Sequence, residues 1–222
     1  MDLWQIIQEP WALRALLAST MVGVTCGILG AFIVLRNMSL IGDALSHAIL
    51  PGVFVAFIFF GYNTIGFFFG TVIAGLLFAV AMTWIQQNTK TKNDAVIGIV
   101  FTAMFSIGVI GISAISKTGV HLDLKDFLFG NVLGVGDQDL MMTGIVMVMV
   151  ILSIIVFYRY LFASTFQPTI AATMGIPVKL MHYYLMLLLS FSVVAAMQTV
   201  GVILVVAMLI TPASTALLLA NR

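Results

Sequence analysis

Charged residues are scarce in this sequence. Only 8% of its 222 residues are Asp, Glu, Lys or Arg, whereas 62% are hydrophobic. Soluble domains carry about 25% charged residues, and each membrane-spanning helix needs about 20 apolar ones. The net charge of +1, without a cluster of Lys or Arg, excludes the electrostatic footprint of a nucleic-acid-binding protein. The composition therefore predicts an integral membrane protein whose main contact is membrane lipid.

Other scarcities exclude particular kinds of site. The single cysteine, Cys26, excludes an intrachain disulfide framework and a multi-cysteine zinc site, and its neighbours Gly23 and Gly27 suggest a small packing residue. The single glutamate, Glu9, leaves no HExxH motif for an intramembrane metalloprotease. A Walker A motif is also lacking, so we expect a chain that is not itself an ATPase or another enzyme. The first ten residues are acidic rather than basic, which argues against a cleavable signal peptide.

Long apolar runs divide the chain into about seven transmembrane helices, which predicts an all-α, multi-pass membrane protein. The expected spans are 12–35, 41–60, 65–85, 95–115, 140–162 and two within 180–219, the last of them interrupted at Thr211–Pro212. The apolar piece 127–135 is too short to span and is expected to be re-entrant or interfacial. The positive-inside rule places the first loop in the cytoplasm, together with most of the basic residues, namely Arg36, Lys90, Lys92, Arg159, Lys179 and Arg222.

Asp43 and His47 are the two potential metal ligands that lie deep in an apolar run. Their i,i+4 spacing puts both side chains on one face of a helix, about 5–6 Å apart at Cβ. Pro51 and Gly52 follow one turn later and predict a kink that re-aims this face. An ionised Asp within the bilayer costs at least about 2.5–3.5 kcal/mol, so a functional role is expected. The alternatives are a first-turn acid at a helix N-terminus for Asp43 and a neutral, buried imidazole for His47.

Other polar residues carry weaker signals. His121 and Asp123 could form a metal contact at the membrane edge, but a solvated loop explains them as well. His182 precedes two tyrosines near a cytoplasmic interface and is interpreted as part of an aromatic belt. The methionines of the span 140–162 lie in a uniformly apolar helix without cysteine, so we interpret them as packing residues rather than Cu(I) ligands.

Several segments, in this order, resemble the membrane permease subunit of ABC importers for manganese, zinc or iron. They are NMSLIGDALSHAILPG (37–52), DAVIGIVFTAMFSIGV (94–109), DLKDFLFGNVLGV (123–135), MGIPVKLMHYYLMLLL (174–189) and QTVGVILVVAMLITPASTALLL (198–219). The resemblance covers the chain from about Trp11 to Arg222. It implies one permease domain over 1–222, in a prokaryotic plasma membrane, that forms a homodimer and binds cytoplasmic ATPase subunits. It also implies that an extracellular metal-binding lipoprotein delivers the metal, which Asp43 and His47 would contact.

The sequence departs from the family pattern in two places. Family members usually continue with one or two further hydrophobic segments after the position of Arg222, so the chain is expected to be C-terminally truncated or to lack a helix. In the segment Phe166–Pro168, relatives often have Asp where this chain has Gln167.

One carboxylate and one imidazole cannot satisfy a metal ion alone. Zinc takes four ligands and manganese prefers six, with oxygen donors acceptable. A two-fold axis beside this helix would supply two Asp and two His, which predicts a homodimer with the metal pathway on its axis. The expected metal is a transported divalent ion, Mn²⁺, Zn²⁺ or Fe²⁺, rather than a permanently bound cofactor. The alternative is a stand-alone secondary metal transporter, which would be expected to carry more intramembrane carboxylates and an inverted repeat.

Two further groups are predicted from local patterns. Val53, Phe57 and Phe60 lie further along the metal helix, and the two phenylalanines are expected to form an outer gate. The cytoplasmic loop 163–178 is expected to contact the ATPase through a short helix with Pro at its start and Gly at its end. Its expected exposed face is Ile170, Ala171 and Met174, and the residues assigned to coupling are Gln167, Pro168, Ile170, Ala171, Met174 and Gly175.

Overall fold

The computed structural model describes residues 9–61, 63–116, 130 and 134–220, and in this part of the chain the regular structure is α-helical. The helices are α2 (Pro10–Leu35), α3 (Ile41–Ala48), α4 (Leu50–Phe60), α5 (Thr64–Asn88), α6 (Asn93–Ser116), α8 (Asp137–Phe166), α9 (Pro168–Thr173), α10 (Val178–Val200) and α11 (Val202–Ala220). Seven spans among the described residues are long and apolar enough to cross a membrane, with α3 and α4 counted as one. The predicted fold class is confirmed.

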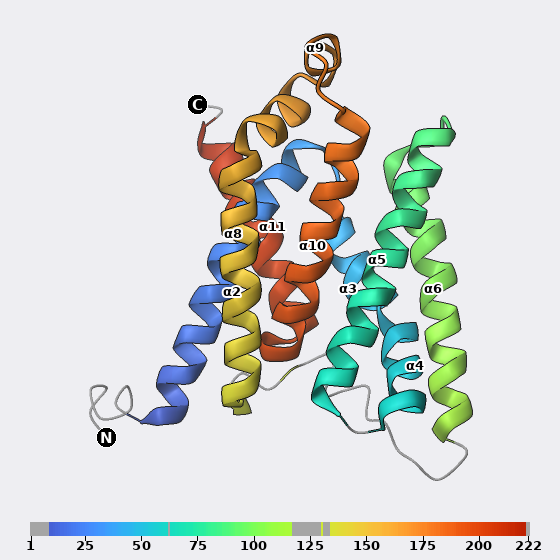
Figure 1. Cartoon of the computed structure of the whole chain (residues 1–222), viewed down its shortest axis with the longest axis vertical. Helices are drawn as coiled ribbons and strands as arrows, with labels where there is room; N and C mark the ends of the chain where they lie inside the picture. Colours follow the sequence, from blue (N-terminus) through green and yellow to red (C-terminus); the bar gives the residue numbers. More distant parts are fainter. Residues whose placement is uncertain (1–8, 62, 117–129, 131–133, 221–222) are drawn as a thin grey trace.

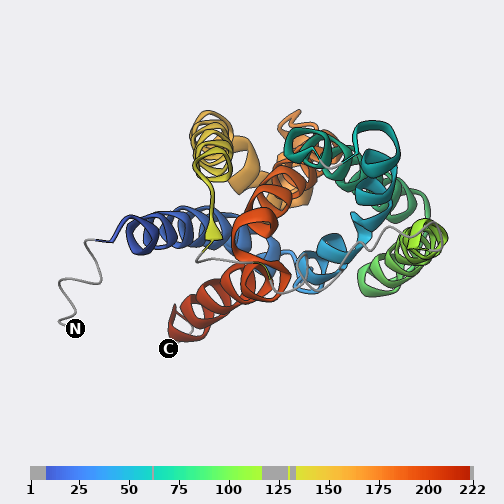
Figure 2. The ribbon, with the colours of Figure 1, turned by 90° about the horizontal axis from the view of Figure 1, so that it is seen from below.

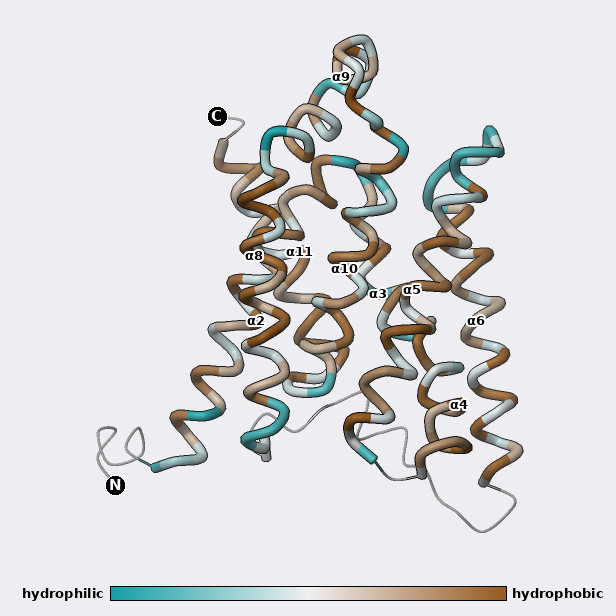
Figure 3. Tube along the Cα trace, in the orientation of Figure 1, coloured by the Kyte–Doolittle hydropathy of each residue, from teal (hydrophilic) through white to brown (hydrophobic). Residues whose placement is uncertain are grey.

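The long helices run roughly side by side and alternate in direction (Figure 1). The short helix α9, the turn between α2 and α3 and the turn between α5 and α6 all lie at one end of the bundle. The turn between α10 and α11 lies at the opposite end, where Gly201 adopts a positive φ of 84° that favours glycine. Hydrophobic residues dominate the helices, and hydrophilic ones collect near the ends (Figure 3). This distribution is that of a bundle whose sides face lipid.

Viewed along the helices, α3 lies at one edge of the molecule between α11 and α6, while α5 and α10 pack on the other side (Figure 2). Two glycines allow α11 to approach α2 and α3 closely. A Cβ on Gly30 would lie 2.0 Å from the backbone oxygen of Leu209, and one on Gly42 would lie 2.5 Å from the Leu209 side chain. Leu209 is therefore wedged between α2 and the first turn of α3, and it is fully buried.

The last span differs from its expected form. The sequence predicts an interruption at Thr211–Pro212, but α11 is a continuous helix through Pro212. A proline removes only one hydrogen bond from the helix interior, and the Pro212 ring packs beside Gly27 of α2, 3.9 Å from where a Cβ would lie. This contact helps to hold the helix together across the missing bond. The expected break at Gln198–Gly201, by contrast, is confirmed by the end of α10 at Val200.

Candidate metal site and its supports

The predicted kink beyond His47 is present as a one-residue interruption between two helices of the same span. Ile49 ends α3 and begins α4, and Pro51 lies in the first turn of α4, where its missing N–H leaves no intrahelical bond unmade. The break packs against α6 at Gly108, where a Cβ would lie 2.6 Å from the Leu50 side chain. The eight-residue helix α3, which carries Asp43 and His47, thus ends at this break before α4 begins.

The structure brings Asp43 and His47 together, as the i,i+4 spacing predicts. The His47 Nε2 atom lies 3.7 Å from Asp43 Oδ1. The side chain of Asp43 is 58% exposed and that of His47 is 25% exposed, so both reach the open side of α3. A gap of this size between a carboxylate oxygen and an imidazole nitrogen is longer than a hydrogen bond, and it leaves both atoms able to approach a third atom.

The other face of α3 is buried and holds the pair in place. Ala44, Leu45 and Ala48 are almost fully buried. Ser46 is buried as well, and its hydroxyl donates to the backbone oxygen of Gly42 at 2.8 Å, as expected for a packing hydroxyl rather than a ligand. These contacts fix the rotation of α3 and therefore the direction in which its two ligands point.

Two aromatic rings of α6 flank the imidazole. The His47 ring centroid lies 6.1 Å from that of Phe101 and 5.9 Å from that of Phe105, the second in an edge-on arrangement. These rings limit the orientations of His47 and cover one side of it with apolar surface. Among the described residues, no group of three or more His, Cys, Asp or Glu comes close enough to hold a metal ion. The described part of the chain thus offers two potential metal ligands on an open face.

The two proposed gate residues lie in different environments. Phe57 is half-buried, and its ring stacks on Phe67 of α5 with centroids 6.5 Å apart. Phe60 is 61% exposed on the last turn of α4. Val53, one turn before Phe57, is buried in the packing of α4. The structure therefore places Phe57 within the bundle and Phe60 on its surface.

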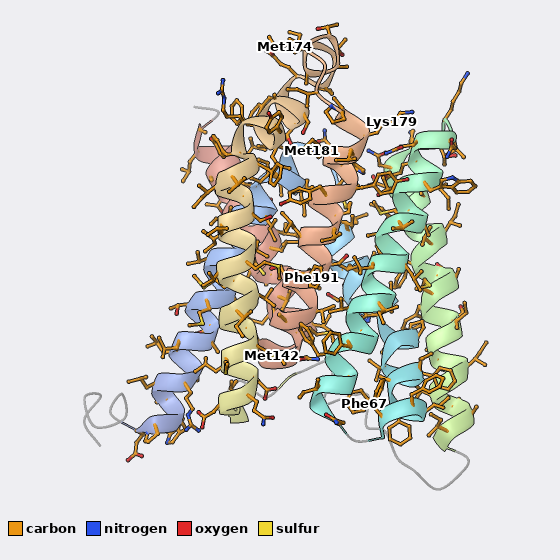
Figure 4. The ribbon with its side chains drawn as sticks, in the orientation of Figure 1. Phe67, Met142, Met174, Lys179, Met181 and Phe191 are labelled. Atoms are coloured by element: carbon orange, nitrogen blue, oxygen red, sulfur yellow. The ribbon has the colours of Figure 1, made fainter. Side chains whose placement is uncertain are left out.

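The short helix α9 begins and ends where Pro168 and Gly175 predict. It begins at Pro168 after Gln167, whose side chain makes no capping hydrogen bond, and ends before Gly175, whose φ is +80°. Its orientation corrects one expectation: Ala171 is 1% exposed and faces the protein, whereas Ile170 is 48% and Met174 is 74% exposed. Figure 4 shows Met174 at the end of the bundle. A cavity of about 360 Å³ lies between α9 and the end of α8, lined mainly by apolar side chains.

The end of the bundle that carries α9 also holds a polar cluster that the sequence does not predict. Arg36, directly after α2, donates from Nε to Thr165 Oγ1 at 3.1 Å and from Nη2 to Ser164 Oγ at 3.0 Å, and its Nη1 lies 2.8 Å from His182 Nδ1. The interpretation of His182 as an aromatic-belt residue is therefore wrong, because its ring is bonded inside the bundle. Burial lowers the pKa of Arg36 to about 10, which still leaves it charged at neutral pH.

Some sequence-based assignments fall outside the described part of the chain. These are the possible edge contact of His121 with Asp123 and most of the expected re-entrant piece 127–135.

The chain has extensive similarity to known transport proteins. Residues 8–222 match the model of the ABC 3 transport family. The chain is 50% identical over 218 residues to the manganese transport system membrane protein MntC of Halalkalibacterium halodurans, covering 98% of this chain and 73% of that protein. It is 48% identical over 208 residues to the manganese import system permease protein ScaB of Streptococcus parasanguinis, covering 94% of this chain and 72% of that protein.

A solved structure has the same architecture. PsaBC from Streptococcus pneumoniae in complex with Fab superposes with a TM-score of 0.79 at 43% sequence identity, over 96% of this chain and 74% of the matched chain.

Proposed function

This chain belongs to the ABC 3 transport family, and from that membership we propose that it is the permease subunit of an ATP-driven importer of manganese. It is a multi-pass protein of the plasma membrane. The observation that carries the proposal is the pair of Asp43 and His47, held by a buried helix face on an element of its own and open on one side. The relatives named above are manganese transport and import proteins, which favours this metal over zinc or iron.

We place the metal site on the axis of a homodimer. The two ligands of one protomer point away from its core, and α3 lies at the edge of the bundle between α11 and α6 (Figure 2). A second copy related by a two-fold axis would bring its own Asp43 and His47 to the same place. Two carboxylates and two imidazoles, completed by water, form the mixed oxygen and nitrogen environment that manganese accepts. A site shared between protomers would also open when the protomers move apart.

The energy for transport is proposed to come from cytoplasmic ATPase subunits. The exposed part of α9, formed by Ile170 and Met174, is an apolar projection at the end of the bundle that carries the basic turns. A helix of six residues is too short to be stable alone, so its position depends on the elements around it. We propose that the segment 163–178 docks on the ATPase and that an extracellular lipoprotein delivers the metal at the opposite end.

The test uses the full-length protein, reconstituted in proteoliposomes with its ATPase partner and the extracellular binding protein. Uptake of manganese is measured with and without ATP. The wild-type complex should accumulate manganese only when ATP is supplied. Uptake by the permease alone, driven by an ion gradient, would instead indicate a secondary transporter.

Variants of the metal pair make the test specific. Asp43→Asn and His47→Ala each remove two ligands per dimer and should reduce ATP-dependent uptake to background. They should also lower manganese affinity by more than about tenfold, a loss that even an outer-shell partner of a metal ligand can produce. Asp94→Asn is the matched control, because Asp94 is an exposed acid in the first turn of α6, at the end of the bundle that carries α9. Normal uptake by both site variants would refute the assignment.

A further inference from the structure

Arg36 is the donor at the centre of a hydrogen-bond chain that joins four helices. A guanidinium group has only donors, so the His182 Nδ1 atom, 2.8 Å from Nη1, must be the acceptor. The imidazole is then neutral with its proton on Nε2, and that N–H donates to Gln86 Oε1 at 3.1 Å. The chain therefore runs from the end of α2 through α10 to the end of α5, with a branch to Ser164 and Thr165 at the end of α8.

The cluster holds both helices that flank α9 without touching α9 itself. Ser164 and Thr165 lie in the last turn of α8, which ends at Phe166, and His182 lies near the start of α10. The guanidinium forms no salt bridge, because all three of its described acceptors are neutral. A displacement of the α8 end or of the α10 start must therefore either move Arg36 or break hydrogen bonds of a half-buried cation, which is costly.

The link from Arg36 to the metal pair is a short and rigid turn. Asn37 adopts a φ of 56°, and its backbone N–H donates to Val34 O at 3.0 Å. The backbone N–H of Met38 donates to Ile33 O at 3.2 Å. This pair of bonds is a Schellman motif, which fixes the direction of the chain as it leaves a helix. The Met38 side chain is 1% exposed, so the turn is also anchored in the core. Asp43 follows in the first turn of α3.

A cavity beside the cluster gives the segments room to move. It has a volume of about 610 Å³, and Arg36, His182, Lys179 and Pro168, the first residue of α9, are among the residues that line it. None of the described residues that line it is a carboxylate, so nothing in the lining competes with the neutral acceptors for the guanidinium. The amide nitrogen of Gln86 is buried without a hydrogen-bond partner, which leaves a spare donor at the end of the chain. The cluster around Arg36 can thus follow a movement of the α8 end or the α10 start rather than block it.

We propose that Arg36 is a positioning residue that transmits movement of α9 to the metal pair on α3. Its guanidinium follows the ends of α8 and α10, and the rigid turn 36–40 carries that movement to Asp43. The inference rests on the proposed function, in which the segment 163–178 contacts the ATPase. The coupling is thus assigned to the geometry of one side chain. A planar group with three directed bonds to α8 and α10 constrains both the distance and the angle between these helices.

The test measures how much manganese is transported per ATP hydrolysed in proteoliposomes that contain the full complex. Arg36→Lys keeps the positive charge but replaces the planar fork by a single ammonium group, which cannot span the three acceptors in the same way. We expect the complex to assemble, to bind manganese through Asp43 with normal affinity and to hydrolyse ATP, while transport per ATP falls by about tenfold, the size of effect that misplacing a functional group produces. A change in this ratio is not expected from a general loss of stability, which lowers both rates together.

Arg14→Lys is the matched control, since Arg14 lies on the same helix, 41% exposed, in an ion pair with Asp137 at the opposite end. It should leave the ratio unchanged. His182→Ala should lower the ratio as Arg36→Lys does, and the double variant should fall no further, because both changes break the same chain of bonds. If Arg36→Lys is not recovered in the membrane, Ser164→Ala combined with Thr165→Val removes two acceptors instead and should also lower the ratio.

A normal ratio in Arg36→Lys, or in the variant without the two acceptors, would overturn the inference while ATP-dependent uptake by the wild type still stands. A wild-type complex that takes up no manganese would remove the proposed function together with the inference. A uniform loss of ATP hydrolysis and transport in Arg36→Lys, with an unchanged ratio, would assign the residue a purely structural role and would also overturn it.

Discussion

The close contact between α4 and α5 makes Gly52→Ala the sharpest test of the packing around the metal site. A Cβ on Gly52 would lie 2.2 Å from the backbone oxygen of Gly70, 2.7 Å from its carbonyl carbon and 2.8 Å from the Ala74 side chain. Two of these atoms belong to the backbone and cannot rotate away. To reach ordinary contact distances, α4 and α5 must move apart by about 1 Å, which a close-packed interior resists.

The loss of stability from this clash is partly offset by the higher helix propensity of alanine. Overpacking of this kind costs about 1–3 kcal/mol, while Ala in place of Gly inside a helix contributes about 0.5–1 kcal/mol of stability. We therefore expect Gly52→Ala to destabilise the protein by about 1 kcal/mol, and by no more than about 2.5 kcal/mol. The displaced start of α4 should also shift the break at Ile49 and slow manganese uptake.

The assay is thermal unfolding of the purified protein in detergent, with uptake measured in parallel. Gly98→Ala on α6 is the matched control, because no atom lies within 4 Å of the added Cβ and only the gain in helix propensity remains. The control should be as stable as the parent or slightly more stable. A Gly52→Ala protein that unfolds at the temperature of Gly98→Ala or above would refute the packing argument.

Three further predictions concern the gate and the short helix. Phe57→Ala should raise ATP-independent leakage of manganese from vesicles because it removes a ring that stacks on Phe67, whereas Phe60→Ala, at a 61% exposed position, should not; equal leakage in both would place the barrier elsewhere. Met174→Arg, at a 74% exposed position on α9, should reduce co-purification of the ATPase, and normal recovery with normal ATP turnover would remove this helix from the interface. Gln167→Asp should supply the missing N-cap bond, worth about 0.5–2 kcal/mol, and strengthen that association; unchanged recovery would show that the cap is not limiting.

Local rules were sufficient for much of the fold and for the metal pair. The spans follow from hydropathy, since each apolar run must satisfy its own backbone in lipid. The approach of Asp43 to His47 follows from the helical repeat, and the break after Ala48 follows from Pro51. Gly52 was interpreted as part of the same kink, but its tight contact with Gly70 shows a second role in helix packing that one sequence could not reveal.

Long-range contacts account for what the sequence could not supply. The acceptors of Arg36 lie 128, 129 and 146 residues away, and no local pattern connects them. The orientation of α9 was also beyond reach, because a helix of six residues is too short to show a hydrophobic period. Ala171 was therefore placed on the exposed face although it packs against the protein. Pro212 was expected to interrupt α11, and its contact with α2 at Gly27 is likewise a tertiary effect.

The position of Leu209 has a consequence for how the protein is made. The backbone of Leu209 packs against Gly30 of α2 and its side chain packs against Gly42, so this residue fixes the first turn of the helix that carries Asp43 and His47. The ribosome produces α3 early, but α11 starts only at Val202. Until α11 enters the membrane, the early helices lack the wedge that sets the direction of the two ligands. The proposed metal site is therefore completed late in biogenesis, and a nascent chain that has inserted only its first helices does not yet hold Asp43 and His47 in their mature geometry.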